Sequence, residues 1–189
     1  MPPESTRLTD SEVMTLEAFA DTIIPGERRH ATDRAVAGAA DGGGAVASGA
    51  VDLMASEEGG LGGLLPTLVI GLNDHAQAYA DKHGLTLDDS VPAFVALDFD
   101  DRTALAAELM APRTDEQDLW VPLAMFSVMA WDTGASVHTT EALAAGHPGL
   151  TTMGFNGPDA DGLWRFPDFS YRRVLASPHP HTTPSGDPA

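Results

Sequence analysis

Leu119-Trp-Val-Pro-Leu-Ala-Met-Phe-Ser-Val-Met-Ala-Trp131 is the longest nearly uninterrupted apolar stretch of the chain. It carries no polar stripe, so we expect a central helix that is buried on all sides. Thr114 and Gln117 have the spacing of a capping box just before it. Pro122 lacks a backbone donor, which predicts either a helix that starts nearby, with Pro122 in its first turn, or a kink. The stretch is about a dozen residues long, whereas a membrane span needs roughly twenty, so no membrane span is expected.

Further helices are predicted around this segment. Thr9 and Glu12 have the spacing of a second capping box, and the helical period of apolar residues that follows ends at Pro25-Gly26. Weaker patterns predict a short helix within 45–55, a helix from about 66 to 83, a small helix or turn at 91–97, a helix from Asp98 or Asp100 through Met110, and a last short helix at 139–145. The predicted fold class is therefore all-α, with a compact multi-helix domain over residues 1–145.

The sequence changes character at Gly146. From there to Ala189, Pro and Gly recur without a helical period, so we expect an extended C-terminal arm. The arm carries aromatic and arginine side chains of the kinds that dominate protein interfaces: Trp164, Arg165, Phe166, Phe169, Tyr171, Arg172 and Arg173. Either the arm packs over its own helices or it wraps a partner, and the sequence leaves both possibilities open.

Charge and cysteine content exclude several function classes. The chain has 189 residues, with 28 Asp and Glu against 10 Lys and Arg, and a formal net charge of -18. Binding to nucleic acid needs clustered basic residues, and an anionic membrane surface would repel this chain. Cysteine is absent, which removes disulfides, thiolate nucleophiles and metal sites that depend on cysteine.

One carboxylate stands out by its position. Asp21 falls in the last turn of the first predicted helix, where the negative end of the helix dipole disfavours a negative charge. We expect a dedicated cationic partner, either Arg28, Arg29 or His30 in the next loop or a basic group on another chain. The alternative is an acid on an exposed face that water solvates.

Catalytic and cofactor motifs are not recognisable. Asp98, Asp100 and Asp101 could converge on Mg²⁺, but Asp98 and Asp101 are also ordinary residues for a helix start, and capping is favoured. The histidines lack the spacing of a helical zinc site. There is no phosphate-binding glycine loop and no nucleophile elbow. The residue patterns therefore assign no catalytic residue, no metal ligand and no bound cofactor.

Leu16-Glu-Ala-Phe-Ala-Asp-Thr-Ile-Ile-Pro-Gly26 resembles the N-terminal signature of the gluconate 2-dehydrogenase subunit 3 family. The resemblance continues through Gly49-Ala-Val-Asp52, Phe94 to Leu97 and Asp101-Arg102. It implies a mainly helical small subunit that accompanies an FAD-containing large subunit of the glucose–methanol–choline oxidoreductase type, without chemistry of its own. The twin-arginine signal common in that family is missing, which argues against an export role, and the arm at residues 146–189 resembles only a cytoplasmic, actinobacterial-looking branch.

The leading hypothesis is a cytoplasmic, non-catalytic accessory subunit that binds and stabilises an FAD-dependent oxidoreductase. Its expected contact surfaces are the end of the first helix, with Asp21, Arg28 and Arg29, and the aromatic arm. FAD is expected on the partner chain and not on this one.

Two alternatives remain. In the first, the chain is a small stand-alone enzyme with an apolar pocket between the central helix and the arm, and Asp21, Asp132, His138 or Tyr171 transfers protons. In the second, it is a structural protein that associates with copies of itself.

Overall fold

A computed structural model describes residues 8–38, 40–57 and 59–155 of the chain. Within these residues the protein contains eight helices and no strand, which confirms the predicted all-α fold. The helices are α1 (Asp10–Ile23), α2 (Ala50–Ala55), α3 (Leu65–His83), α4 (Ala93–Ala96), α5 (Phe99–Leu109), α6 (Gln117–Thr133), α7 (Thr139–Ala144) and α8 (Pro148–Thr152). The aromatic and basic residues predicted for the C-terminal arm lie outside the described residues.

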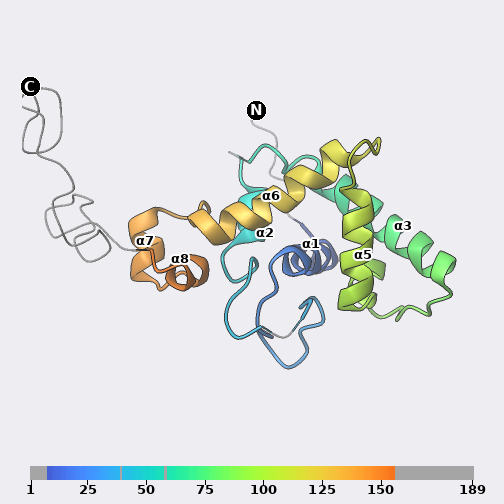
Figure 1. Cartoon of the computed structure of the whole chain (residues 1–189), viewed down its shortest axis with the longest axis horizontal. Helices are drawn as coiled ribbons and strands as arrows, with labels where there is room; N and C mark the ends of the chain where they lie inside the picture. The colour runs from blue at the N-terminus through green and yellow to red at the C-terminus, as the bar shows by residue number, and fades with distance from the viewer. Residues whose placement is uncertain (1–7, 39, 58, 156–189) are drawn as a thin grey trace, which may run out of the picture. The chain divides into compact units, whose positions relative to one another are not determined.

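The central helix of the body is α1. It packs against α2, α3, α4, α5 and α6, and Figure 1 shows it in the middle of the body with the other helices around it. Leu16 and Phe19 are fully buried, and the rings of Phe19 and Phe94 lie 6.1 Å apart between their centroids. The core is therefore built around the amphipathic first helix.

The ends of α1 follow the sequence closely. The Thr9 hydroxyl accepts a hydrogen bond from the amide of Glu12 at 3.3 Å, and the Glu12 carboxylate accepts one from the amide of Thr9 at 2.7 Å. The predicted capping box is thus confirmed. After α1 the chain forms a loop whose two ends touch, because a Cβ added to Gly26 would lie 2.6 Å from the amide nitrogen of Gly44. Only glycine backbones can approach one another this closely.

The start of α6 differs from the prediction. The helix begins after Glu116 without a side-chain cap, and Pro122 lies inside it rather than in its first turn. The Thr114 hydroxyl donates to the carbonyl of Ala111 at 3.0 Å, while the Gln117 side chain accepts from the amide of Arg113 at 3.2 Å. The predicted second capping box is wrong because both side chains serve the preceding turn instead.

The burial of α6 also differs from the prediction. Its inner side is buried and includes Trp120, Leu123 and Ser127. On its outer side, however, Met125 is 55% exposed and Met129 is 39% exposed. Among the described residues, α6 packs against α1, α2, α5 and α8, and these helices leave its outer side uncovered. The prediction of burial on all sides is therefore wrong.

The helical body extends past residue 145. Helix α8 falls within the range that the sequence assigned to the arm, and it packs against α6 and α7. This close packing depends on Gly149, whose backbone lies directly against the carbonyl of Trp131. Among the described residues, no helix is both long and apolar enough to cross a membrane.

Candidate functional site

Two aspartates occupy corresponding positions in two helices. Asp21 lies in the last turn of α1 and Asp132 in the last turn of α6, and neither helix has a basic residue in that turn. The negative end of the helix dipole disfavours both carboxylates. A cation from another part of the protein would offset this effect at each carboxylate. The two sites differ in whether such a cation is present.

Asp21 is fully buried and pairs with Arg29. A guanidinium nitrogen of Arg29, Nη1, donates to Oδ2 of Asp21 at 2.7 Å, and Nε of the same group lies 3.0 Å from Oδ2 of Asp33. Nη2 lies 3.8 Å from a carboxylate oxygen of Glu17. Of the candidate partners for Asp21 in the next loop, Arg29 is confirmed. Arg28 instead donates to the carbonyl of Ala31 at 3.3 Å.

The titration of this cluster reflects competition between burial and pairing. Burial raises the pKa of Asp21 to about 6, against the attraction of Arg29. Burial alone would lower the pKa of Arg29, but the carboxylates of Asp21, Asp33 and Glu17 raise it. For Asp21 burial outweighs the ion pair, whereas for Arg29 the ion pairs outweigh burial, so the two pKa shifts give opposite accounts of the same contact. We favour an arginine that stays charged, because it faces three carboxylates, and an Asp21 that takes up a proton in mild acid, because its Oδ1 is buried without a hydrogen bond among the described residues.

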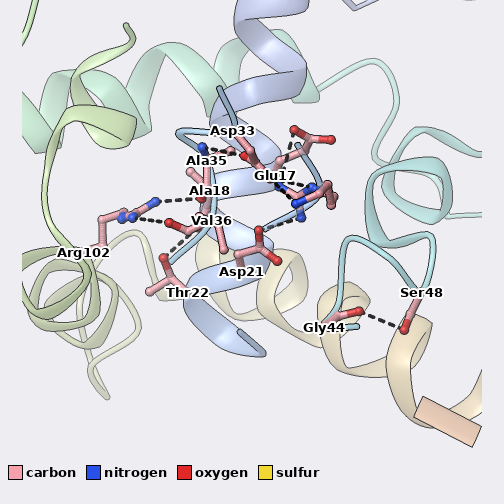
Figure 2. A network of polar contacts seen from close by, with 11 residues as sticks. Glu17, Ala18, Asp21, Thr22, Asp33, Ala35, Val36, Gly44, Ser48 and Arg102 are labelled. Carbon is pink, nitrogen blue, oxygen red and sulfur yellow. Dashed lines mark hydrogen bonds and ion pairs between the residues drawn. The ribbon is translucent and has the colours of Figure 1, made fainter. Parts of the chain in front are cut away.

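A second arginine holds the same loop from the other side. Arg102 of α5 is buried, and its two terminal nitrogens donate to the carbonyls of Ala35 and Val36, each at 2.9 Å. Figure 2 shows Arg102 reaching these carbonyls while Asp21 and Asp33 lie on the α1 side of the loop. Asp33 also accepts from the amide of Ala35 at 3.1 Å. The loop at residues 27–44 is therefore tied both to α1 and to α5.

This arrangement changes the role expected for the end of α1. Asp21 has no exposed surface, so it cannot touch a partner in this conformation, and its assignment as a contact residue is corrected. Arg29 is mostly engaged with the three carboxylates. Arg28 remains exposed. The ion pair between the buried Asp21 and Arg29 holds the loop against α1.

The second site is the outer side of α6, which we call the α6 face: Val121, Pro122, Met125, Val128, Met129 and Asp132. Met125 is 55% exposed, while Val128 and Met129 are each 39% exposed. Asp132 is half-buried, its Oδ1 is buried, and it has no hydrogen bond or ion pair among the described residues. Residues three and four apart in a helix are neighbours on its surface, so Asp132 adjoins Val128 and Met129.

The sequence did not reveal the α6 face. An apolar stretch without a polar stripe is typical of a helix buried on all sides, and an exposed interaction face has the same composition. The signal that could have separated the two was Asp132 itself. A carboxylate at the end of an all-apolar helix is costly inside a core without a cation.

The residues suggested for a stand-alone enzyme do not gather into a described site. Asp21 accepts a hydrogen bond from Arg29. His138 caps α7 and accepts from the amide of Thr140 at 3.3 Å. Tyr171 lies outside the described residues. Trp120 of the central helix is buried and donates to Glu116 at 3.0 Å.

An open groove of about 400 Å³ lies between α3 and α5. His75 and Glu116 line it and contact each other at 2.7 Å, while Lys82 lies 3.6 Å from Glu108. These four polar side chains of the groove are thus already paired with one another. No group of three or more potential metal ligands occurs in the part of the chain that the structure describes. Asp98 accepts from the amide of Asp101 at 3.0 Å, as expected for a helix cap.

Comparison with known proteins places the chain in a family. Residues 10–189 match a family of unknown function, DUF5987. The chain belongs to this family. No curated protein and no solved structure matches it. The DUF5987 match begins at the first residue of α1 and includes all of α6, so both aspartates lie within the region that defines the family.

Proposed function

We propose that this protein is a non-catalytic accessory subunit that binds and stabilises an FAD-dependent oxidoreductase of the glucose–methanol–choline type. The observation that carries the proposal is the α6 face. A contiguous exposed apolar surface on a soluble protein marks a site of interaction. Its two methionines, Met125 and Met129, have flexible side chains that adapt well to a partner surface.

The class of partner comes from the resemblance of residues 16–26 to the gluconate 2-dehydrogenase subunit 3 family. Such a subunit leaves redox chemistry to a flavin on the large subunit. In this proposal FAD belongs to the partner chain, and the accessory subunit stabilises the folded large subunit by binding it.

Co-expression tests the proposal. The chain is produced together with an FAD-dependent oxidoreductase of the glucose–methanol–choline type from its source organism. The mixture is separated by size-exclusion chromatography at low salt and at about 0.15 M salt, where surface charges are screened beyond about 8 Å. We expect the two chains to elute together at both salt concentrations. Flavin absorbance should follow the large subunit and be absent from the accessory chain alone.

A pair of variants localises the contact. Met125→Glu places a charge in the α6 face and should abolish co-elution, because burying an unpaired charge is costly. Leu85→Glu is the matched control, since Leu85 is also exposed but follows α3 in a loop. It should leave co-elution unchanged. Separate elution of the unmodified chains at both salt concentrations, or flavin bound to the accessory chain alone, would overturn the proposal.

A further inference from the structure

We infer that the α6 face binds an amphipathic helix of a partner protein, and that this helix places a lysine or arginine side chain on Asp132. The inference rests on the proposed function for the identity of the partner, and it adds the chemistry by which the partner is recognised. Three features of the described residues support it: the spacing of the apolar side chains, the state of Asp132, and the charge around α6.

The spacing of the apolar side chains favours a helix as the bound element. Val121, Met125, Val128 and Asp132 recur at intervals of three and four residues along α6, and Pro122 and Met129 flank this row. Such a row forms a ridge that packs into the grooves of another helix. Addition of a β-strand would instead need an exposed sheet edge to pair with, and the described residues contain no strand.

Asp132 supplies the polar end of the site. Its carboxylate lies in the last turn of α6, where the helix dipole disfavours it, and its Oδ1 is buried without a hydrogen bond among the described residues. Oδ1 itself is buried, but the side chain as a whole is only half-buried. A cation on a partner can therefore approach the accessible part of the carboxylate and offset its unpaired charge. The corresponding carboxylate of α1, Asp21, shows the solution that this fold uses, which is an arginine at 2.7 Å.

The charge around α6 argues for a basic partner and against a second copy of this chain. Helix α6 carries Asp118 near its start and Asp132 near its end, and it has no lysine or arginine. Two antiparallel copies would bring Asp118 of one against Asp132 of the other, and two parallel copies would bring like residues together. Both arrangements place like charges side by side, and the whole chain has a net charge of -18. A partner helix with basic residues beside its apolar stripe avoids both the like-charge contacts and the repulsion between two acidic chains.

A peptide assay tests the inference separately from the proposed function. The probe is a fluorescein-labelled synthetic peptide of about 20 residues, with leucine at helical i, i+3, i+4 and i+7 positions and arginine beside that stripe. The comparison peptide has glutamate in place of each arginine. Binding to the full chain is measured by fluorescence anisotropy at about 0.15 M salt. We expect the basic peptide to bind at least about tenfold more tightly than the acidic one, which corresponds to about 1.4 kcal/mol.

Variants of the chain decide whether the α6 face is the site. Met125→Ser removes most of an apolar side chain without adding a charge and should weaken binding of the basic peptide by about tenfold. Asp132→Asn should weaken it by about fivefold, as expected for loss of a charged hydrogen bond. Asp89→Asn removes the same charge from an exposed position in the loop after α3 and should change the affinity less than about twofold. Circular dichroism of each variant confirms that the helices are retained.

Several outcomes would overturn the inference. Equal weakening by Asp132→Asn and Asp89→Asn would mean that the peptide senses only net charge. A dimer in light scattering that Met125→Glu dissociates would identify a second copy as the occupant. Binding that appears only after Arg165, Arg172 and Arg173 are replaced by alanine would identify the chain's own C-terminal segment.

The inference and the proposed function can fail independently. Co-elution with the oxidoreductase that Asp132→Asn leaves unchanged, together with no preference for the basic peptide, would overturn the inference and leave the proposed function standing. Specific peptide binding without co-elution would support the inference about the α6 face and overturn the proposed function.

Discussion

The last turns of α1 and α6 each hold an aspartate that the helix dipole disfavours, yet the two carboxylates have opposite surroundings. Asp21 is fully buried and has Arg29 at 2.7 Å. Asp132 is half-buried and has no cation among the described residues. The two sites thus separate an internal use of a carboxylate from one that stays open to a partner.

The difference arises from the segment that follows each helix. After α1 the chain turns at Pro25-Gly26 and brings Arg29 back to Asp21 only eight residues later. After Asp132, no lysine or arginine occurs before Arg165. The segment that follows α1 therefore supplies a cation for Asp21. The segment directly after α6 contains no lysine or arginine that could pair with Asp132. Asp21 is therefore paired within the fold, whereas Asp132 has no cationic partner among the described residues.

The largest effect is expected from Arg29→Ala. It leaves Asp21 as a buried carboxylate without a cation, and breaking a buried pair from one side costs about 3–5 kcal/mol. Urea unfolding followed by circular dichroism measures the loss. Arg28→Ala is the matched control, because Arg28 is exposed and donates to a backbone carbonyl at 3.3 Å, so it should cost less than about 0.5 kcal/mol. Similar small losses for both variants would contradict an internal role for Asp21.

A pH effect of more than about 2 kcal/mol is expected at the same site. Burial raises the pKa of Asp21 from 3.8 to about 6, so the folded state binds a proton more tightly than the unfolded state does. This contribution to stability is fully present below about pH 4 and is lost as the pH rises through about 6. At about 1.4 kcal/mol for each pKa unit, the full contribution is about 3 kcal/mol. The unmodified protein should lose somewhat more than about 2 kcal/mol of it relative to Asp21→Asn between pH 4 and pH 7, because the unfolded carboxyl is already partly ionised at pH 4.

The comparison with Asp21→Asn is needed because a neighbour acts in the opposite direction. Burial would raise the pKa of Asp33, but amide donors from Arg29 and Ala35 and the charge of Arg29 hold it below its ordinary value. Stability from Asp33 is therefore lost as the pH falls below about 4. Unfolding curves of the two proteins at a series of pH values isolate Asp21. A difference that does not change with pH would show that Asp21 remains ionised throughout.

The sequence predicted the elements of this fold better than their surroundings. Capping and the helical period located α1 because these signals are local, and the pair Pro25-Gly26 marked its end. The position of Asp21 in that helix left a dedicated partner and a solvated carboxylate as alternatives, and the structure shows the first. Whether an apolar helix has one or two covered sides depends on its neighbours, however, and residues 119–131 carry no local sign of this. The sequence analysis therefore expected exposure at the end of α1 and burial of residues 119–131 on all sides, whereas in the structure Asp21 is fully buried and Met125 and Met129 are exposed.

A loss of about 2 kcal/mol is expected from Arg102→Met. Arg102 donates to the carbonyls of Ala35 and Val36 at 2.9 Å each, and hydrogen bonds to a charged group contribute about 1.5–3 kcal/mol. The methionine keeps much of the buried volume, so the change tests the hydrogen bonds to the loop. Hydrogen exchange of the loop amides at residues 27–44 should become faster, while exchange in α6 should not change. Uniform acceleration in both regions would show that Arg102 supports the whole body and not the loop.

The smallest effect, with the opposite sign, is expected from Asp132→Ala. This change removes a carboxylate that lacks a partner and that the helix dipole disfavours, so the protein should gain between zero and about 1 kcal/mol of stability in urea unfolding. Asp98→Ala is the matched control, because Asp98 caps α5 through the amide of Asp101 at 3.0 Å, and its loss should cost about 1 kcal/mol. If Asp132→Ala destabilises the isolated chain as much as this control does, Asp132 has an internal role like that of Asp21. A gain in stability combined with weaker binding of the basic peptide would instead show that Asp132 is kept for recognition at the expense of the isolated fold.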